Sequence, residues 1–225
     1  MRSAQFKAIF IILLIFGGLG WYIFGGNVSL PSLPNFSEWF QKEETNTASK
    51  SSAKKNNNSS TSTGQVIDSY KGVKVYYNGR VGNVSGRNTT KDGYNLGLKY
   101  QCVEFAKRFY YEAYSHKMPD SYGHARDFFD GRLAQGEYNK ARGMRQYKNG
   151  GNERPRVNDL VIIGPSTFNS FGHLFIITKV TNNGVEFIQQ NPGPRNPSRG
   201  SYPLVNSNGH WSIKADDVVG WLRLS

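Results

Sequence analysis

The sequence predicts an α+β fold in which one helix packs on an antiparallel sheet, preceded by one transmembrane helix. Two observations predict the globular part: a helix-compatible run at residues 101–114 comes first, and several short apolar strands separated by turn residues follow it. A third observation, the uncharged apolar run at residues 8–24, predicts the transmembrane helix. The predicted divisions of the chain are therefore residues 1–28, 29–65 and 66–225.

Residues 1–28 are predicted to be a cytoplasmic stub and an uncleaved signal anchor. The apolar run has 17 residues, the lower limit for a bilayer-spanning helix, and no Ala-x-Ala-like cleavage site follows it. A cleaved signal peptide is the alternative. Arg2 and Lys7 precede the run, so the N-terminus is expected in the cytoplasm and everything downstream outside it. The expected localisation is a single-pass membrane protein with an extracytoplasmic domain.

Residues 29–65 are predicted to be a flexible linker. From Gln41 to Gln65 there are six Ser, four Thr and four Asn among 25 residues, with no aromatic residue, Val, Ile or Leu. Such a stretch cannot bury enough apolar surface to offset the entropy of ordering it. The domain that follows is basic, with 22 of the 28 Lys and Arg and 13 of the 16 Asp and Glu. This balance suggests attraction to polyanions, whether nucleic acid, anionic lipid or an acidic wall polymer. The basic residues are scattered, which favours an ordinary solvated basic surface, and no nucleic-acid motif is present, so no nucleic-acid partner is expected.

The first half of the domain is predicted to hold a strand, a helix and long loops. A short strand is expected at residues 71–77 and a Gly- and Asn-rich loop at 82–97, leading into the helix at 101–114. A second, shorter helix is expected at 125–133, and the polar, basic residues 136–154 are expected to form an exposed excursion.

The second half of the domain is predicted to be antiparallel sheet. Asn182-Asn183-Gly184 lies between two apolar runs and is typical of a β-hairpin turn. The expected strands cover residues 159–163, 172–180, 185–191, 211–213 and 218–224.

Cys102 is the first candidate for chemistry. It is the only cysteine of the chain and lies at the entrance of the predicted helix, where the macrodipole favours thiolate over thiol. In an exported chain, one unpaired cysteine also indicates a reactive thiol rather than a disulfide framework. The alternative is a small buried hydrophobic residue, which is the usual state of a free cysteine.

His173 is the best-placed base, because it opens an apolar strand directly after a glycine. A Cys–His pair needs a third group that accepts a hydrogen bond from the other ring nitrogen. Pairing across the predicted hairpin puts His173 opposite residues 189–191, whereas Glu186 lies too close to the turn. The other histidines, in polar helix, loop or turn contexts, are His116, His124 and His210.

Together these residues resemble the CHAP family, the cysteine, histidine-dependent amidohydrolases and peptidases of the papain-like superfamily. The closest motif is that of the amidase domain of glutathionylspermidine synthetase/amidase. The resemblance covers roughly residues 70–225 and implies a papain-like fold, with Cys102 as nucleophile and His173 as base. The segments that carry it are Tyr100–Ala106 (YQCVEFA), Asn158–Val161 (NDLV), Gly172-His173 and Gln189–Asn191 (QQN).

The resemblance also implies an oxyanion hole made by the backbone N–H of Cys102 with a donor from Gln101 or the preceding loop. The amidase subgroup usually has a glutamate where this chain has Gln189. An amide oxygen can orient the imidazole but cannot give it a full negative charge, so Gln189 is the expected third member and Asn191 its rival. No zinc or EF-hand spacing is visible, and no metal or cofactor is expected.

The resemblance implies hydrolysis of amide bonds, either in peptidoglycan or in glutathionylspermidine-type conjugates. The predicted extracytoplasmic location favours peptidoglycan, because polyamine conjugates are cytosolic substrates. The expected function is therefore a membrane-tethered peptidoglycan amidase or endopeptidase that forms a thioester acyl-enzyme on Cys102. Two alternatives stay open: a glutathionylspermidine-type amidase or acyltransferase, and a catalytically weak wall-binding or scaffold protein that retains the fold.

Overall fold

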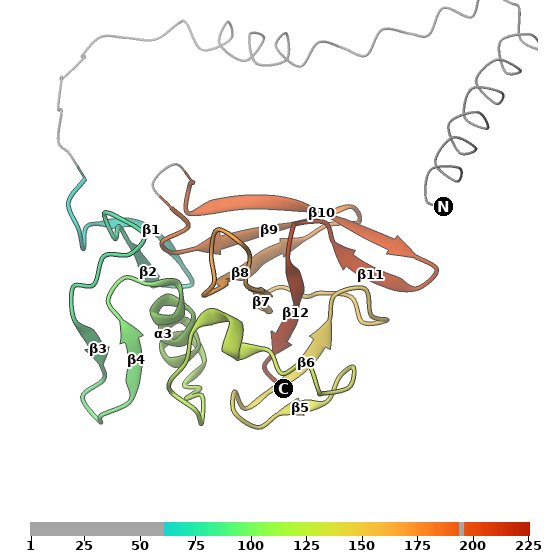
Figure 1. Cartoon of the computed structure of the whole chain (residues 1–225), viewed down its shortest axis with the longest axis horizontal. Coiled ribbons are helices and arrows are strands. Elements are labelled where there is room, and N and C mark those ends of the chain that lie inside the picture. Colours follow the sequence, from blue (N-terminus) through green and yellow to red (C-terminus); the bar gives the residue numbers. More distant parts are fainter. Residues whose placement is uncertain (1–60, 194–195) are drawn as a thin grey trace, which may run out of the picture. The chain divides into compact units, whose positions relative to one another are not determined.

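A computed structural model describes residues 61–193 and 196–225 (Figure 1). The predicted anchor and nearly all of the predicted linker lie outside the described residues, so both stay predictions. In the part of the chain that is described, no helix has the length and apolar character needed to cross a membrane.

The described residues form one α-helix, α3 (Cys102–Tyr114), one 3-10 helix, η1 (Ala125–Phe128), and three antiparallel sheets. The main sheet has eight strands in the order β11-β10-β9-β8-β7-β12-β6-β5. Its strands are β5 (Tyr138–Asn139), β6 (Met144–Lys148), β7 (Leu160–Ile163), β8 (His173–Val180), β9 (Gly184–Gln189), β10 (Arg199–Ser207), β11 (His210–Ile213) and β12 (Val218–Arg223). The two-stranded sheets pair β1 (Val66–Tyr70) with β2 (Val73–Tyr76), and β3 (Arg87–Thr89) with β4 (Asn95–Leu98). One helix with an antiparallel sheet is the predicted α+β class.

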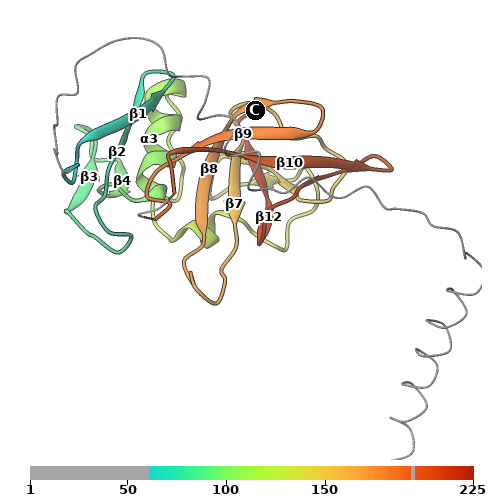
Figure 2. The ribbon, with the colours of Figure 1, turned by 90° about the horizontal axis from the view of Figure 1, so that it is seen from above.

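Helix α3 packs between the main sheet and the two small hairpins, as Figures 1 and 2 both show. Its apolar residues recur at helical spacing, so Phe105, Phe109 and Tyr110 are buried on one face. Ser115 ends the helix in the left-handed conformation and donates its N–H to the last-turn carbonyls. The sheet residues that share this core cluster include Leu160, Ile162, Leu174, Ile176, Ile188 and Leu222.

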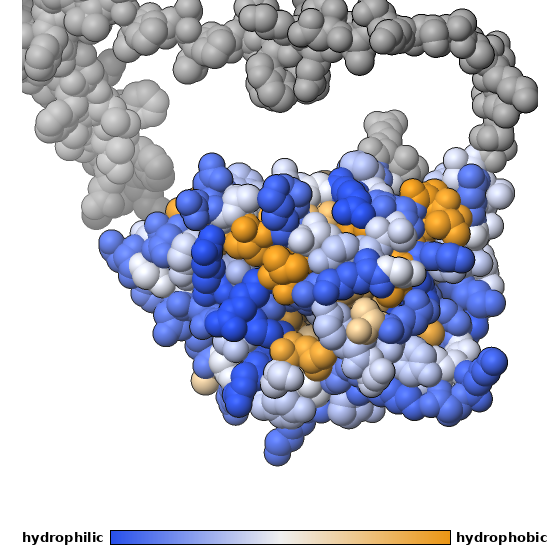
Figure 3. Space-filling view, turned by 180° about the vertical axis from the view of Figure 1, so that it is seen from behind, coloured by the Kyte–Doolittle hydropathy of each residue, from blue (hydrophilic) through white to orange (hydrophobic). Residues whose placement is uncertain are grey.

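A second core cluster is built from residues of β7, β8, β9, β10, β11 and β12. Phe175 and Phe187 stack across adjacent strands with ring centroids 4.4 Å apart, and the fully buried Trp221 belongs to the same cluster. On the face seen in Figure 3, apolar residues form small patches separated by polar ones. The main sheet is therefore apolar on both faces, and α3 covers only one of the two clusters.

The structure contains strands that the sequence patterns did not predict. Residues 82–97, expected as loop, contain β3 and most of β4, which form a two-stranded sheet. Both strands are short, β3 is polar and β4 includes a glycine, so neither gives a clear apolar alternation. Strand β10 pairs with β9 and β11 but is mostly exposed, so it lacks a continuous apolar run. The predicted strand at residues 71–77 is β2, and β1 precedes it.

Two predictions for residues 125–154 are wrong. The helix expected at 125–133 is only the single 3-10 turn η1. The expected exposed excursion at 136–154 contains β6, which pairs with β12 inside the main sheet. Its Gln146 is fully buried because both ends of the side-chain amide are hydrogen-bonded to the backbone of Asp130, at 2.9 and 2.7 Å. Polar character here reflects internal hydrogen bonding rather than exposure.

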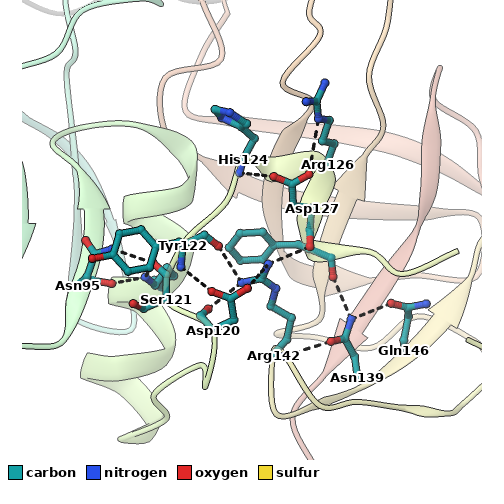
Figure 4. A network of polar contacts seen from close by, with 12 residues as sticks. Asn95, Asp120, Ser121, Tyr122, His124, Arg126, Asp127, Asn139, Arg142 and Gln146 are labelled. Atoms are coloured by element: carbon teal, nitrogen blue, oxygen red, sulfur yellow. Dashed lines mark hydrogen bonds and ion pairs between the residues drawn. The ribbon is translucent and has the colours of Figure 1, made fainter. Parts of the chain in front are cut away.

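The buried Arg142 organises the segment around η1 (Figure 4). Its guanidinium donates to the carbonyls of Asp120 and Asp127 at 2.8 and 2.9 Å and stacks on the ring of Phe128 at 4.0 Å. Within η1, the backbone N–H of Arg126 donates to the carbonyl of Phe171 at 2.9 Å. The network therefore supports the chain just before β8 begins.

Truncation of Phe109 tests how strongly α3 depends on this packing. The ring is fully buried in the core cluster, so Phe109→Ala is expected to lower the free energy of unfolding by about 3–5 kcal/mol. Urea titration followed by tryptophan fluorescence measures the change. Val84→Ala is the control, because Val84 is 57% exposed and its loss should cost less than about 0.5 kcal/mol.

Candidate active site

A sharp turn between β4 and α3 places Cys102 at the first position of the helix. Tyr100 adopts a left-handed conformation with φ of 61°, which is uncommon outside glycine. The N–H of Gln101 donates to the carbonyl of Leu98 at 3.0 Å, and Gln101 itself is extended at the N-cap. The N–H of Cys102 therefore belongs to the first turn, whose donors have no acceptor within the helix. The thiol is half-buried.

His173 begins β8 directly after a position that only glycine fits. Gly172 has φ of +73°, and a Cβ there would lie 2.5 Å from the carbonyl oxygen of Ile163. The strand register pairs His173 with Ile163 and Phe175 with Gln189. This register brings the imidazole Nε2 to 2.9 Å from Oε1 of Gln189. The predicted hairpin pairing of His173 with the far end of the next strand is confirmed.

The orientation of the Gln189 amide assigns the tautomer of His173. Nε2 of Gln189 donates to the carbonyl of Pro197 at 3.0 Å, so Oε1 is the atom that faces the ring. An oxygen accepts, so Nε2 of His173 donates and the neutral ring has no proton on Nδ1. This nitrogen is free to accept a proton.

Cys102 packs against the core cluster that includes Leu174 at the start of β8, and the backbone N–H of Leu174 acts to lower the pKa of its thiol. Leu174 follows His173 directly, so the structure brings the nucleophile candidate and the base candidate to the same strand end. Their roles in a reaction remain predictions.

Burial decides the charge state of both groups. It raises the pKa of the Cys102 thiol to about 11, although backbone N–H groups of Leu174 and Val103 act in the opposite direction. Burial also lowers the pKa of His173 to about 4, and the hydrogen bond to Gln189 offsets only part of this effect. The expectation that the helix end alone yields a thiolate is therefore reversed: the resting site holds a thiol and a neutral imidazole at pH 7.

The two other candidates, Gln101 and Asn191, contact each other rather than His173. Nε2 of Gln101 donates to the carbonyls of Val81 and Asn83 at 3.1 and 2.9 Å, which occupies both of its hydrogens. Asn191 donates to Oε1 of Gln101 at 2.6 Å and to the carbonyl of Val81. In this arrangement Gln101 has no free side-chain donor for an oxyanion, and Asn191 does not hold the imidazole. Both fix the loop beside the site.

The remaining histidines lie apart from Cys102. His116 contacts the carbonyl of Arg142, His124 stacks on Phe171, and His210 contacts the carbonyl of Gly150. Among the described residues, no group of three or more His, Cys, Asp or Glu could hold a metal ion. A surface cavity of about 810 Å³ is lined by residues between 120 and 142 and includes neither Cys102 nor His173.

Two residues beneath the site were not identified from the sequence. Glu104 and Gln190 are buried and hydrogen-bonded to each other at 2.8 Å, on the side of the helix that faces β9. The sequence does place both residues at inward positions. Glu104 lies beside the apolar stripe of α3, and Gln190 is two residues after the buried Ile188, so it points to the same face of the sheet. A buried carboxylate is rare unless it is paired.

Comparisons with known proteins find one family model that covers the candidate site residues. Residues 89–191, which include Cys102, His173 and Gln189, match the family model described as CHAP domain. No curated protein matches the chain. Solved structures with similarity include Ly7917 with the hydrolysing product of MDP (23% identity, TM-score 0.25, covering 32% of this chain and 29% of that chain). Another is the wild-type endolysin LysIME-EF1 (18% identity, TM-score 0.35, covering 62% and 58%). The chain thus spans less than two thirds of each of these proteins.

Replacing the neutral third member by a carboxylate should activate the thiol. In Gln189→Glu, a negative charge beside the ring raises the pKa of His173, which favours transfer of the Cys102 proton. The rate of Cys102 alkylation by iodoacetamide at pH 7 is therefore expected to rise in this variant. In the unsubstituted chain the rate should climb with pH through neutrality. A rate independent of pH between about 5 and 8 would instead indicate a preformed thiolate–imidazolium pair.

The lowered pKa of His173 also predicts acid sensitivity. The unfolded chain protonates this residue near its ordinary value of 6.5, whereas the folded chain resists protonation until about pH 4. Stability from this residue is therefore present above pH 6.5 and is lost as pH falls toward 4, by about 2 kcal/mol at pH 4.5. Urea unfolding at pH 7 and pH 4.5 should show a smaller pH effect in His173→Gln than in the unsubstituted chain. An equal effect in both would contradict the assignment.

Proposed function

We propose, from the CHAP domain that this chain carries at residues 89–191, that it is a cysteine amidohydrolase or peptidase acting on amide bonds of peptidoglycan. The observation that carries the proposal is the hydrogen bond from His173 to Gln189, because it leaves Nδ1 unprotonated at the strand end that also contacts the Cys102 thiol. A thiol beside an oriented, proton-accepting imidazole is the minimal arrangement for nucleophilic acyl transfer.

The reaction follows from these atoms. Nδ1 of His173 takes the proton of the Cys102 thiol while Sγ attacks the amide carbon of the substrate, and the carbonyl oxygen becomes an oxyanion. The backbone N–H of Cys102, at the positive end of α3, donates to that oxyanion. The imidazolium then protonates the leaving nitrogen as the C–N bond breaks, which leaves a thioester. Water attacks the thioester with His173 again as base, and the thiol is restored.

The predicted topology supports a wall substrate within this proposal. A signal anchor at residues 1–28 and a linker at 29–65 would hold the domain outside the membrane, close to the wall. The formal net charge of the chain is +12, which favours association with anionic wall polymers. We therefore include membrane tethering and an extracytoplasmic location in the proposal.

Zymography on purified cell walls tests the activity. The full chain is expected to clear the wall layer, and Cys102→Ala is expected to abolish clearing because the thioester cannot form. Circular dichroism of the variant checks that it is folded. Mass spectrometry of fragments released from defined peptidoglycan then identifies the bond. No clearing by the unsubstituted chain would overturn the proposal.

A wall-binding protein that retains the fold without activity is the second candidate. The neutral Gln189 favours it, because an amide cannot stabilise the imidazolium as a carboxylate would. Alkylation of Cys102 separates the two candidates. For an enzyme, His173→Ala should lower the alkylation rate at pH 7, whereas an unchanged rate would favour the scaffold.

A further inference from the structure

The fully buried Gln190 lies where the end of β9 meets the start of α3, the helix that carries Cys102. It directly follows Gln189, the last residue of β9. Successive residues of an extended backbone point to opposite faces, so the side chains of Gln189 and Gln190 contact different neighbours. Gln189 contacts His173, whereas Gln190 contacts the first turn of α3. One strand end therefore touches both the base and the element that carries the nucleophile.

The side-chain amide of Gln190 is fully engaged. Its Nε2 donates to the carbonyl of Gln101 at 3.0 Å and to Oε2 of Glu104 at 2.8 Å. Its Oε1 accepts from the backbone N–H of Tyr76 at 2.8 Å. With both hydrogens and the oxygen in use, the amide has one orientation only. It cannot rotate without leaving a buried polar group unpaired.

The buried Glu104 fixes this amide in turn. Its carboxylate accepts from Arg108 at 2.6 Å and from Asn88 at 2.8 Å, so its negative charge is paired and its oxygens are satisfied. Glu104 and Arg108 are one helical turn apart and both are almost completely buried. Such a network is stiff, because breaking one member leaves a buried charge uncompensated.

The carbonyl that Gln190 holds belongs to the peptide unit that joins Gln101 to Cys102. The N–H of that same planar unit is the N–H of Cys102, the donor available for an oxyanion. A hydrogen bond on the carbonyl sets the plane of the unit, and it also polarises the N–H. The same carbonyl also accepts the helical bond from the N–H of Phe105 at 3.2 Å, so Gln190 adds a second constraint, from outside the helix, on the direction and strength of the donor.

We propose that Gln190, supported by Glu104 and Arg108, is a positioning residue that aims the N–H of Cys102 at the developing oxyanion. The inference rests on the proposed function and adds a residue to it. Gln190 does not touch the reacting atoms and acts through the Gln101–Cys102 peptide unit. Loss of an oxyanion donor typically costs about 10²–10³ in kcat, so misdirecting this donor is expected to cost about 10–100-fold.

The chain offers a direct spectroscopic test, because Cys102 is its only cysteine. Labelling the full chain with ¹⁵N-cysteine gives a single amide cross-peak, that of the proposed donor. In Gln190→Met the carbonyl of Gln101 loses the shorter of its two hydrogen bonds and keeps only the helical one from the N–H of Phe105, so the cross-peak is expected to move upfield in the nitrogen dimension. An unmoved cross-peak in a folded variant would overturn the proposal.

Gln146→Met is the matched control. Gln146 is equally buried and its amide is also hydrogen-bonded to backbone groups, but these belong to Asp130. Gln146 also accepts from Asn139 at 3.0 Å, next to the η1 region (Figure 4). It should lower stability as Gln190→Met does and leave the Cys102 cross-peak in place. If Gln190→Met does not fold, Gln190→Asn retains the polar group but shortens it by one methylene, and it should give the same shift.

Kinetics on soluble peptidoglycan fragments complete the test. Gln190→Met is expected to lower kcat about 10–100-fold with little change in KM, because the oxyanion exists only in the transition state. Gln146→Met should leave both constants unchanged. If the unsubstituted chain cleaves and Gln190→Met retains full kcat, the positioning role is wrong while the proposed function stands. If the unsubstituted chain does not cleave, the proposed function fails, and the cross-peak still decides whether Gln190 sets the peptide unit.

Discussion

The contact between the end of β9 and the first turn of α3 is the constraint on which the site depends. Cys102 lies on the helix and His173 on the sheet, so their separation is set by how these two elements meet. Gln189 is the last residue of β9 and Gln190 follows it directly, and their side chains reach the imidazole and the Gln101 carbonyl at 2.9 and 3.0 Å. Because both contacts come from one extended backbone, the strand geometry fixes the placement of the two candidate groups.

Burial imposes a second constraint, which acts on charge rather than position. The same packing that orders Cys102 and His173 removes water from them, and this favours the neutral form of each. Beside them, Glu104 and Arg108 form an ion pair in the interior, with Nε of Arg108 2.6 Å from Oε1 of Glu104. The ion pair of the site is therefore Glu104 with Arg108, whereas burial favours the neutral forms of Cys102 and His173. Transfer of the thiol proton to the imidazole must then accompany attack on the substrate.

The sequence could predict the parts of the fold that depend on local periodicity and turn residues. The helix beginning at Cys102 and the β8–β9 hairpin follow from spacing, which also placed His173 opposite residues 189–191. Spacing did not decide between Gln189 and Asn191 as the partner of the ring, and the structure places Gln189 there. Strands β6 and β10 could not be predicted, because β6 owes its burial to partners such as Asp130 and β10 is mostly exposed. Gln190 is similar: its polarity makes sense only with the distant Gln101 beside it.

A neutral third member changes what stabilises the imidazolium. Burial lowers the pKa of His173 to about 4, and the amide of Gln189, which selects the tautomer but adds no charge, offsets only part of this effect. The imidazole is then unprotonated throughout the neutral range, so a base is always present, although a weak one. The stabilisation of the ion pair must come from the attraction between thiolate and imidazolium and from the positive end of α3. Both interactions act only at short range. The distance between Cys102 and His173 therefore affects the stability of the ion pair more in this chain, where Gln189 is neutral, than it would if a carboxylate contacted the imidazole.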